Sequence, residues 1–115
     1  MIVMHEATLN DSRAVLELSN DPSVRAASFE TNRINAETHR KWYATKLADR
    51  SCIFVLFYED EKLIAQIRFD IDAELTGETS ISVASLYRGE GIACGLMAKA
   101  IEFACKKKKI KKIRA

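Results

Sequence analysis

Apolar side chains recur at helical spacing in the first half of the chain, at residues 14–18 and again at residues 39–47. Asn10 or Asp11 stands where a residue would cap the first of these helices, and Asn35 stands where one would cap the second. The pattern therefore predicts two amphipathic helices before the middle of the chain.

The segments beside these helices have other patterns. Residues 20–22, Asn-Asp-Pro, should end the first helix, because the residue before a proline avoids helical geometry. Residues 23–34 are mostly polar and are expected to form a loop. Residues 2–4, Ile-Val-Met, are expected to form a short first strand.

After residue 50 the helical period gives way to strand patterns. Residues 52–58 are a continuous β-favouring run, which predicts a strand covered on both faces, and residues 59–62 predict a hairpin turn. Residues 63–71 and 78–84 alternate apolar with polar side chains, so three adjacent antiparallel strands are expected. The helical period then returns from Gly91 with a broad apolar face.

The composition is that of an ordinary globular domain: 48% of the 115 residues are hydrophobic and 30% are charged. This length predicts a single domain over residues 1–115. No apolar run approaches the roughly 20 residues of a membrane span, and the start of the chain lacks signal-peptide features. We therefore expect a cytoplasmic protein that does not bind membranes. The 3 cysteines, Cys52, Cys94 and Cys105, form no Cys-x-x-Cys pair, so we expect reduced core residues and no metal site.

Basic residues are concentrated near the C-terminus, where residues 106–114 hold seven lysines and arginines although the net charge is only +2. Such a run can attract nucleic acid or another polyanion. Lysines at the end of a helix also complement its dipole while staying solvated, and no aromatic side chain is interleaved to stack on bases. We therefore expect no nucleic-acid partner.

Residues 82–93 carry the clearest chemical signal, because a strand there passes through a glycine-containing turn into a long helix. Such a junction directs unpaired backbone N–H groups and the positive end of a helix dipole at one point, which favours phosphate. Gly89 and Gly91 permit positive φ and a close approach of backbone to ligand. A dinucleotide fingerprint would need glycine where Cys94 stands, and the Gly-Lys-Ser/Thr of a Walker loop is missing.

The pattern Arg88-x-x-Gly91-x-Ala93 resembles the acyl-CoA pyrophosphate loop of the GNAT family of N-acetyltransferases, which reads Gln/Arg-x-x-Gly-x-Gly/Ala. The order of predicted elements is similar to that family over nearly the whole chain. The resemblance implies an α+β fold of three layers (α/β/α), with a mixed, mainly antiparallel sheet and flanking helices. Family members continue beyond residue 115, so it also implies a C-terminally incomplete acyl-CoA N-acyltransferase-like domain that lacks the last strands and helix.

The resemblance also implies an activity, which is transfer of an acetyl group from acetyl-CoA to a small-molecule primary amine. Residues 20–25 and 39–43 are similar to amino-sugar nucleotide N-acetyltransferases and, less closely, to ribosomal-protein N-terminal acetyltransferases. A truncated, non-catalytic remnant that binds a ligand or a partner is the alternative. Loss of half of the family's cofactor slot is the feature that could separate these two alternatives.

Particular residues receive roles from the same resemblance. The expected acetyl-CoA contacts are Val83, Ala84, Arg88, Gly89, Glu90, Gly91, Ile92 and Ala93. Glu78 is the candidate general base, and Ser82, on the same strand face, is a candidate to hold a water for it. Arg25, Phe29 and Asn32 are expected to bind the amine substrate. Structural alternatives are a solvated glutamate at residue 78 and an ordinary polar loop at residues 23–34.

Four other side chains are open to two interpretations. His39 and Trp42 are interpreted as packing residues on a helix face, although they belong to the motif just described. Arg68 and Asp70 either reach the substrate cleft or simply pair across the sheet. Because the family's sheet continues past the fourth strand, the resemblance also predicts an exposed strand edge and hence a homo-oligomer.

Overall fold

The computed structural model describes residues 1–27, 32–89 and 91–114. Its strands are β1 (Ile2–Glu6), β2 (Cys52–Glu59), β3 (Lys62–Ile71), β4 (Thr76–Val83) and β5 (Lys112–Arg114). Its helices are α1 (Ser12–Ser19), α2 (Pro22–Ala26), α3 (Ala36–Ala48) and α4 (Ile92–Lys107), with single 3-10 turns at η1 (Leu9–Asp11) and η2 (Ser85–Tyr87). The five strands form a sheet in the order β1-β2-β3-β4-β5, antiparallel except for the parallel pair of β4 and β5.

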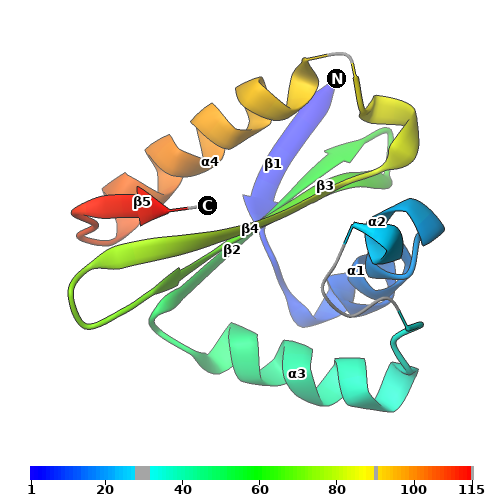
Figure 1. Cartoon of the computed structure of the whole chain (residues 1–115), viewed down its shortest axis with the longest axis horizontal. Helices are drawn as coiled ribbons and strands as arrows, with labels where there is room; N and C mark the ends of the chain where they lie inside the picture. The colour runs from blue at the N-terminus through cyan, green and yellow to red at the C-terminus, as the bar shows by residue number, and fades with distance from the viewer. Residues whose placement is uncertain (28–31, 90, 115) are drawn as a thin grey trace.

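The sheet is the middle of three layers, with α4 on one face and α1, α2 and α3 on the other (Figure 1). The strand β2 shows why, since successive side chains of a strand point to opposite faces. Val55 and Phe57 pack in the cluster that contains Leu96 of α4, whereas Phe54 and Leu56 pack in the cluster formed with α1 and α3. All four β2 side chains are 5% exposed or less. The predicted three-layer α+β fold and its mainly antiparallel sheet are confirmed.

The prediction of a loop over residues 23–34 is wrong at its start, because α2 begins at Pro22. Asp21 Oδ1 accepts hydrogen bonds from the backbone N–H of Ser23 at 2.8 Å and from its Oγ at 2.6 Å. Asp21 is therefore the N-cap and Pro22 the first helical residue, and both residue types are favoured at those positions. Pro22 ends α1 and also starts α2, which places Arg25 on a helix.

The turn predicted at residues 59–62 is confirmed, because Glu59 pairs with Lys62 in the β2–β3 register. Asp60 and Glu61 between them have φ of 48° and 67°. A two-residue hairpin turn needs positive φ at both positions, since only then does the turn match the twist of its strands. This hairpin fixes β3 against β2 and therefore fixes which β3 side chains face α3.

The strand β5 pairs only with the beginning of β4, where Thr76, Gly77 and Glu78 lie opposite residues 112–114. The start of β4 is Thr76, not the predicted residue 78. The rest of β4, residues 79–83, has no second neighbouring strand within the described part of the chain. One edge of the sheet is therefore open beside α2 and the start of α4.

The predicted burial of the cysteines is wrong for two of them, because Cys94 and Cys105 are exposed on α4. Cys52 is half-buried, and all three thiols are free. Burial, with a smaller contribution from the Asp70 carboxylate, raises the pKa of Cys52 to about 12. Cys52 is therefore protonated and unreactive at neutral pH.

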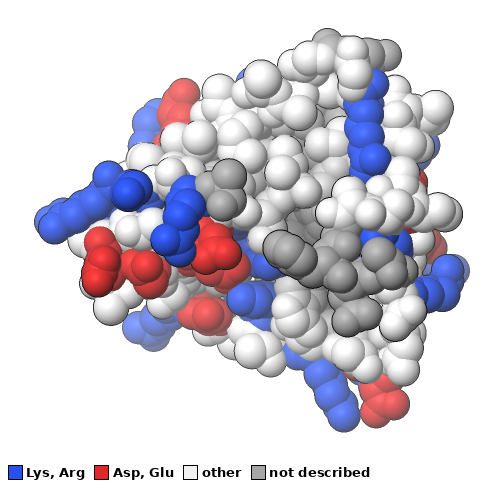
Figure 2. Space-filling view, viewed as in Figure 1, with Lys and Arg blue, Asp and Glu red and all other residues white. Residues whose placement is uncertain are grey.

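The basic C-terminal run lies among carboxylates. Lys106 pairs with Glu102 at 3.2 Å and Arg114 with Glu78 at 3.2 Å, while Lys107 pairs with Glu6. Figure 2 shows lysines and arginines mixed with acidic side chains at the end of the molecule where β5 lies. On this face the run does not form an uninterrupted positive surface.

Candidate active site

The turn between β4 and α4 is held open by two glycines. Gly89 has a φ of 78° and Gly91 a φ of 73°, a region that other residues rarely adopt. Gly91 is the N-cap of α4, and no side chain of the described residues caps the helix, so the N–H groups of its first turn are available to an anion. A Cβ at either glycine would meet nothing within 4 Å. The glycines are therefore needed for backbone conformation and leave space for a ligand.

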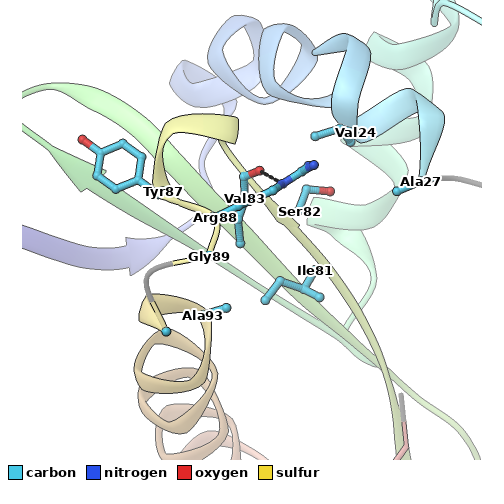
Figure 3. A pocket seen from close by; sticks show the side chains of 10 residues that line it. Val24, Ala27, Ile81, Ser82, Val83, Tyr87, Arg88, Gly89 and Ala93 are labelled. Carbon is cyan, nitrogen blue, oxygen red and sulfur yellow. Dashed lines mark hydrogen bonds between the residues drawn. The ribbon is translucent and has the colours of Figure 1, made fainter.

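A cavity of about 340 Å³, which we call the loop cavity, lies beside this turn (Figure 3). It is lined by Val24, Ala27, Ile81, Ser82, Val83, Tyr87, Arg88, Gly89, Gly91 and Ala93. These residues come from α2, the end of β4 and the turn into α4. Most of the predicted acetyl-CoA contacts thus lie around one space.

The open edge of β4 forms part of that space. The N–H of Ala84 donates to the carbonyl of Ile64 at 2.8 Å, and the carbonyl of Ala84 accepts from the N–H of Tyr87 at 2.9 Å. Alternate residues of a strand turn their backbone groups to opposite sides, so those of Ile81 and Val83 face the open edge. The expectation that Ala84 contributes backbone contacts needs correction, because both of its backbone groups are already used.

Arg88 is directed away from the turn that it was expected to serve. Its Nε donates to the carbonyl of Val83 at 3.0 Å. Figure 3 shows its side chain extending along β4 toward Val24 and Ala27 of α2. Hydrogen bonds from Ser23 lower the pKa of Asp21, and the positive charge of Arg88 lowers it further. In this structure Arg88 joins the edge of β4 to the start of α2.

A larger cavity of about 650 Å³, which we call the α3 cavity, lies between the helices and the other face of the sheet. It is lined by Ser19, Arg25, Ala27, Ile34, Thr38, His39, Trp42, Phe54, Gln66, Arg68, Thr79, Ser80, Ile81 and Ser82. The lining holds two arginines and, among its described residues, no carboxylate. Of this lining, sequence reasoning assigned Arg25 and Ser82 to the site and gave Arg68 as a residue that could reach it.

Arg68 is fixed in the wall of the α3 cavity by three contacts. Its Nε donates to Asp70 at 2.9 Å, one Nη donates to Ser80 Oγ at 3.0 Å, and the guanidinium lies 5.0 Å from the ring centre of Trp42. Asp70 also accepts from Lys46 Nζ at 2.9 Å. Burial tends to raise the pKa of Asp70, but the hydrogen bonds from these two cations outweigh it, so the pKa is lowered. Arg68 thus bonds across the sheet to Ser80 and also reaches the α3 cavity, so the structure shows the geometry of both alternatives.

His39 and Trp42 pack as expected and line the α3 cavity as well. The ring of His39 stacks on Tyr43 at 5.6 Å and lies 5.6 Å from the ring of Trp42. His39 is only 3% exposed, and its Nε2 has no hydrogen-bond partner in the described part of the chain. Burial lowers the pKa of His39, so the imidazole is neutral at pH 7.

Ser82 belongs to both cavities. Its side chain lies on the sheet face that also presents Ser80 and Glu78, since side chains two residues apart share a face. The Ser80 hydroxyl is taken by Arg68, whereas the structure gives the Ser82 hydroxyl no hydrogen-bond partner among the described residues. The Ser82 side chain is therefore available where the two spaces meet.

Of the remaining predicted site residues, some line a cavity and others do not. Glu78 lines neither cavity, and its carboxylate, 62% exposed, pairs with Arg114 at 3.2 Å. Arg25 lines the α3 cavity and donates from Nε to the carbonyl of Ser19 at 2.7 Å. Asn32 contributes its backbone carbonyl, which accepts from Arg25 at 3.5 Å, but it does not line the cavity. Phe29 and Glu90 lie outside the described residues, so their roles stay predictions.

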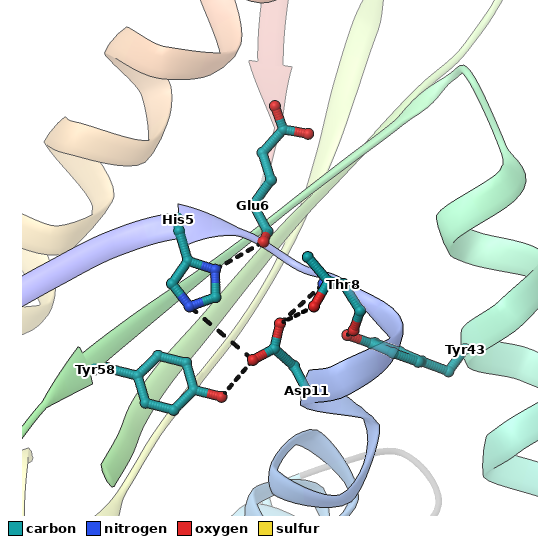
Figure 4. Close-up of polar contacts among 6 residues, drawn as sticks. All are labelled: His5, Glu6, Thr8, Asp11, Tyr43 and Tyr58. Atoms are coloured by element: carbon teal, nitrogen blue, oxygen red, sulfur yellow. Dashed lines mark hydrogen bonds and ion pairs between the residues drawn. The ribbon is translucent and has the colours of Figure 1, made fainter. Parts of the chain in front are cut away.

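A further polar cluster joins the N-terminal strand to the helices, and Figure 4 shows its contacts. Asp11 accepts hydrogen bonds from the Tyr58 hydroxyl at 2.7 Å and from the Thr8 N–H and hydroxyl at 2.9 Å each, while Tyr43 donates to the Thr8 carbonyl at 2.6 Å. Burial opposes ionisation of Asp11, but these hydrogen bonds outweigh it and lower its pKa. All of these polar groups serve one another, which is the arrangement of a structural cluster.

The family model of the acetyltransferase (GNAT) family matches residues 13–115, and the chain belongs to this family. Among curated proteins no match is found. This GNAT-family chain thus has two cavities, the loop cavity at the start of α4 and the α3 cavity, which share Ser82.

Solved structures share this fold at low sequence identity. The spermidine N-acetyltransferase of Vibrio cholerae, in complex with CoA and spermine, superposes with a TM-score of 0.82 at 19% identity, over 97% of this chain and 68% of that one. An acetyltransferase of Salmonella typhimurium with its cofactor acetyl-CoA gives 0.74 at 18% identity, over 92% and 64%. The ribosomal-protein-alanine N-acetyltransferase of Brucella melitensis gives 0.75 at 22% identity, over 92% and 68%. At these identities the likeness shows the fold alone.

Proposed function

We propose that this protein transfers an acetyl group from acetyl-CoA to a primary amine held in the α3 cavity. The observation that carries the proposal is the position of Ser82, which lines both cavities and has an unused hydroxyl. A reaction between two bound substrates needs their reacting atoms at one point. The shared wall of the two cavities provides such a point.

The loop cavity supports the assignment of acetyl-CoA to that side. The uncapped N-terminus of α4 suits a pyrophosphate, and the outward backbone groups of Ile81 and Val83 suit an amide-bearing chain that adds to a strand edge. The N–H of Val83 would also stabilise the oxyanion as the thioester carbon becomes tetrahedral. Arg88 would contribute to pyrophosphate binding through its Nη donors, since its Nε bonds to the carbonyl of Val83.

The amine must lose a proton before it attacks the thioester. We propose that a water bound to the Ser82 hydroxyl takes this proton and passes it to solvent. The α3 cavity is large enough to hold this water together with the amine substrate. Glu78 stays a candidate base, but it stands four residues along β4 from Ser82, which is about 13 Å in an extended strand. A proton would reach Glu78 only through a chain of waters.

The identity of the acceptor is also a proposal. An amino-sugar nucleotide is the proposed acceptor, on the similarity of residues 20–25 and 39–43, and a protein N-terminus is the second candidate. Within the described residues no helix is long and apolar enough to cross a membrane. The cytoplasmic location stays a prediction.

Assembly into a homo-oligomer is also proposed, since residues 79–83 of β4 offer an open strand edge. Light scattering at micromolar concentrations should give a mass above 13.0 kDa at low and at high salt. A mass of 13.0 kDa throughout would contradict this proposal.

The activity is tested by incubating the protein with acetyl-CoA and a panel of primary amines, and by detecting N-acetylated products by mass spectrometry. The matched control for each amine is its N,N-dimethyl derivative, which cannot form a stable amide. Acetylation of at least one primary amine, and of no dimethyl derivative, is expected. Binding of acetyl-CoA by calorimetry with no acetylated product in the panel would favour the non-catalytic alternative.

A further inference from the structure

The α3 cavity has a chemical character that the proposed reaction does not require. Its described lining contains Arg25 and Arg68 but no aspartate or glutamate. Lys46 is a third cation beside the cavity. It shares a carboxylate with Arg68, because Asp70 bonds to both side chains. Among the described residues, cations therefore outnumber carboxylates around the cavity, which makes this part of its wall electropositive.

Arg68 is arranged as a binding group with capacity left over. Its side chain is 21% exposed, and its plane is fixed by Trp42 beside it and by hydrogen bonds to Asp70 and Ser80. A guanidinium has five N–H donors, and these two bonds leave the donors of the other Nη without a partner in the structure. A mostly buried guanidinium with open donors and a fixed plane matches the two oxygens of a carboxylate or phosphate.

Arg25 stands at a different part of the same lining and is also fixed. Its Nε donates to the carbonyl of Ser19, the last residue of α1, so its charge is held against the helix C-terminus. Both arginines are thus positioned before any ligand binds, which reduces the entropy lost when an anion is bound.

We infer that the acceptor is a primary amine that also carries an anionic group, a carboxylate or a phosphate, and that Arg68 binds this group. The inference rests on the proposed function for the assignment of the α3 cavity to the acceptor. A polyamine is disfavoured, because its second ammonium group would lie among cations with no carboxylate in the described lining. The Vibrio cholerae enzyme crystallised with spermine shares the fold. We expect this chain to differ from it in the charge of the acceptor that it binds.

The test uses Trp42, the chain's single tryptophan, as a reporter inside the cavity. Its fluorescence is titrated with two matched pairs of primary amines that differ in charge. The first pair is 4-aminobutyrate and putrescine, and the second is glucosamine 6-phosphate and glucosamine. Titrations are run with CoA present, so that the phosphate probe does not report binding at the start of α4. The two pairs separate a carboxylate from a phosphate as the preferred anion.

The anionic member of at least one pair should bind about tenfold or more tightly than its partner, as expected for one charge-assisted hydrogen-bonded pair. Arg68→Gln should remove this preference, leave the affinity for glucosamine unchanged, and raise the affinity for putrescine or leave it unchanged, because one repelling cation is lost. Arg50→Gln is the matched control, because Arg50 is exposed and lines neither cavity. Arg68→Lys keeps the charge without the fork and should retain part of the preference, which guards against misfolding of the glutamine variant.

Failure of the anionic member to bind more tightly than its partner in both pairs would overturn the inference. An Arg68→Gln variant that folds and keeps the preference would also overturn it. The proposed function fails by a different route, since calorimetry would then show no acetyl-CoA binding or mass spectrometry no acetylated product. The charge preference seen by Trp42 fluorescence does not depend on turnover, so the two failures are distinguishable.

Discussion

The loop cavity and the α3 cavity meet at Ser82 but are made of different parts of the polypeptide. The loop cavity lies against the open backbone edge of β4, and its lining includes small residues such as Gly89, Gly91 and Ala93. The α3 cavity is bounded by large polar and aromatic side chains, among them Arg68 and Trp42. A site of backbone groups suits a ligand part that never varies, whereas a site of side chains can be changed residue by residue to suit a particular acceptor.

The two cavities also differ in how they are held in place. The loop cavity depends on a continuous segment, residues 81–93, with α2 as its far wall. The α3 cavity depends on contacts between distant segments, such as the buried hydrogen bond of 2.9 Å from Gln66 to Ser19 Oγ. Asn20 adds a second such link, because its side chain bonds to the backbone of Ile34 at 2.7 and 2.9 Å. Substitutions in the two cavities should therefore act on different properties.

The largest effect is expected from Gly91→Asp, which places a carboxylate at the start of α4 and a side chain where φ is 73°. Acetyl-CoA should bind about 100-fold more weakly, because the anion site is both distorted and negatively charged. Gly91→Asn is the control, since asparagine tolerates positive φ and adds no charge, and it should bind within about tenfold of the wild type. Calorimetry measures both, and an unchanged affinity in the aspartate variant would remove this turn from the cofactor site.

Ser82→Ala tests the point at which the cavities meet. We expect kcat/KM to fall about 10- to 100-fold, because the water that takes the amine proton loses its hydrogen-bond partner. The Kd for acetyl-CoA should not change. Ser80→Ala is the matched control; because Ser80 holds Arg68, it should raise the KM for the acceptor and leave kcat unchanged. If steady-state kinetics show equal losses of kcat in the two variants, Ser82 has no role in proton removal that Ser80 lacks.

The cavities should also differ in their response to pH, because His39 lines the α3 cavity and no histidine is among the described lining of the loop cavity. Burial lowers the pKa of His39 below its ordinary value of 6.5, so below that pH the unfolded chain binds a proton that the folded chain does not. The free energy of unfolding should therefore decrease as the pH falls from 7 to 5. His39→Gln should flatten this slope, as measured by denaturation at each pH. An equal slope in the His39 variant would place the titration elsewhere.

The smallest effect is expected from Glu78→Gln, although the sequence alone assigns this residue a catalytic role. The side chain is exposed, lines neither cavity and pairs with Arg114, so we expect kcat/KM to change less than about threefold. A general base in contact with the amine would instead account for about 100-fold or more. A loss of that size, with a pH–rate profile shifted on the acid side, would restore Glu78 to the reaction.

Local pattern predicted most of the elements because each depends on neighbours in the sequence. The apolar run at residues 52–58 is confirmed as β2, and the alternation at residues 63–71 is confirmed as β3. The hairpin turn between them is confirmed as well. The missed helix α2 carried a local signal too, since Asp21 before Pro22 and Ser23 is a typical helix start. That error came from treating proline only as a residue that stops helices.

The sequence by itself determined the turn at Gly89 and Gly91, because positive φ restricts the residue type and the uncapped start of α4 follows at a fixed spacing. Only the tertiary structure decided that Arg68, Trp42 and Ser82 line one cavity. The side chains that meet there come from α1, α2, α3 and three strands, and which of them meet depends on strand register and helix packing. Register and packing are set by burial summed over the whole core, so no short segment of the chain contains that information.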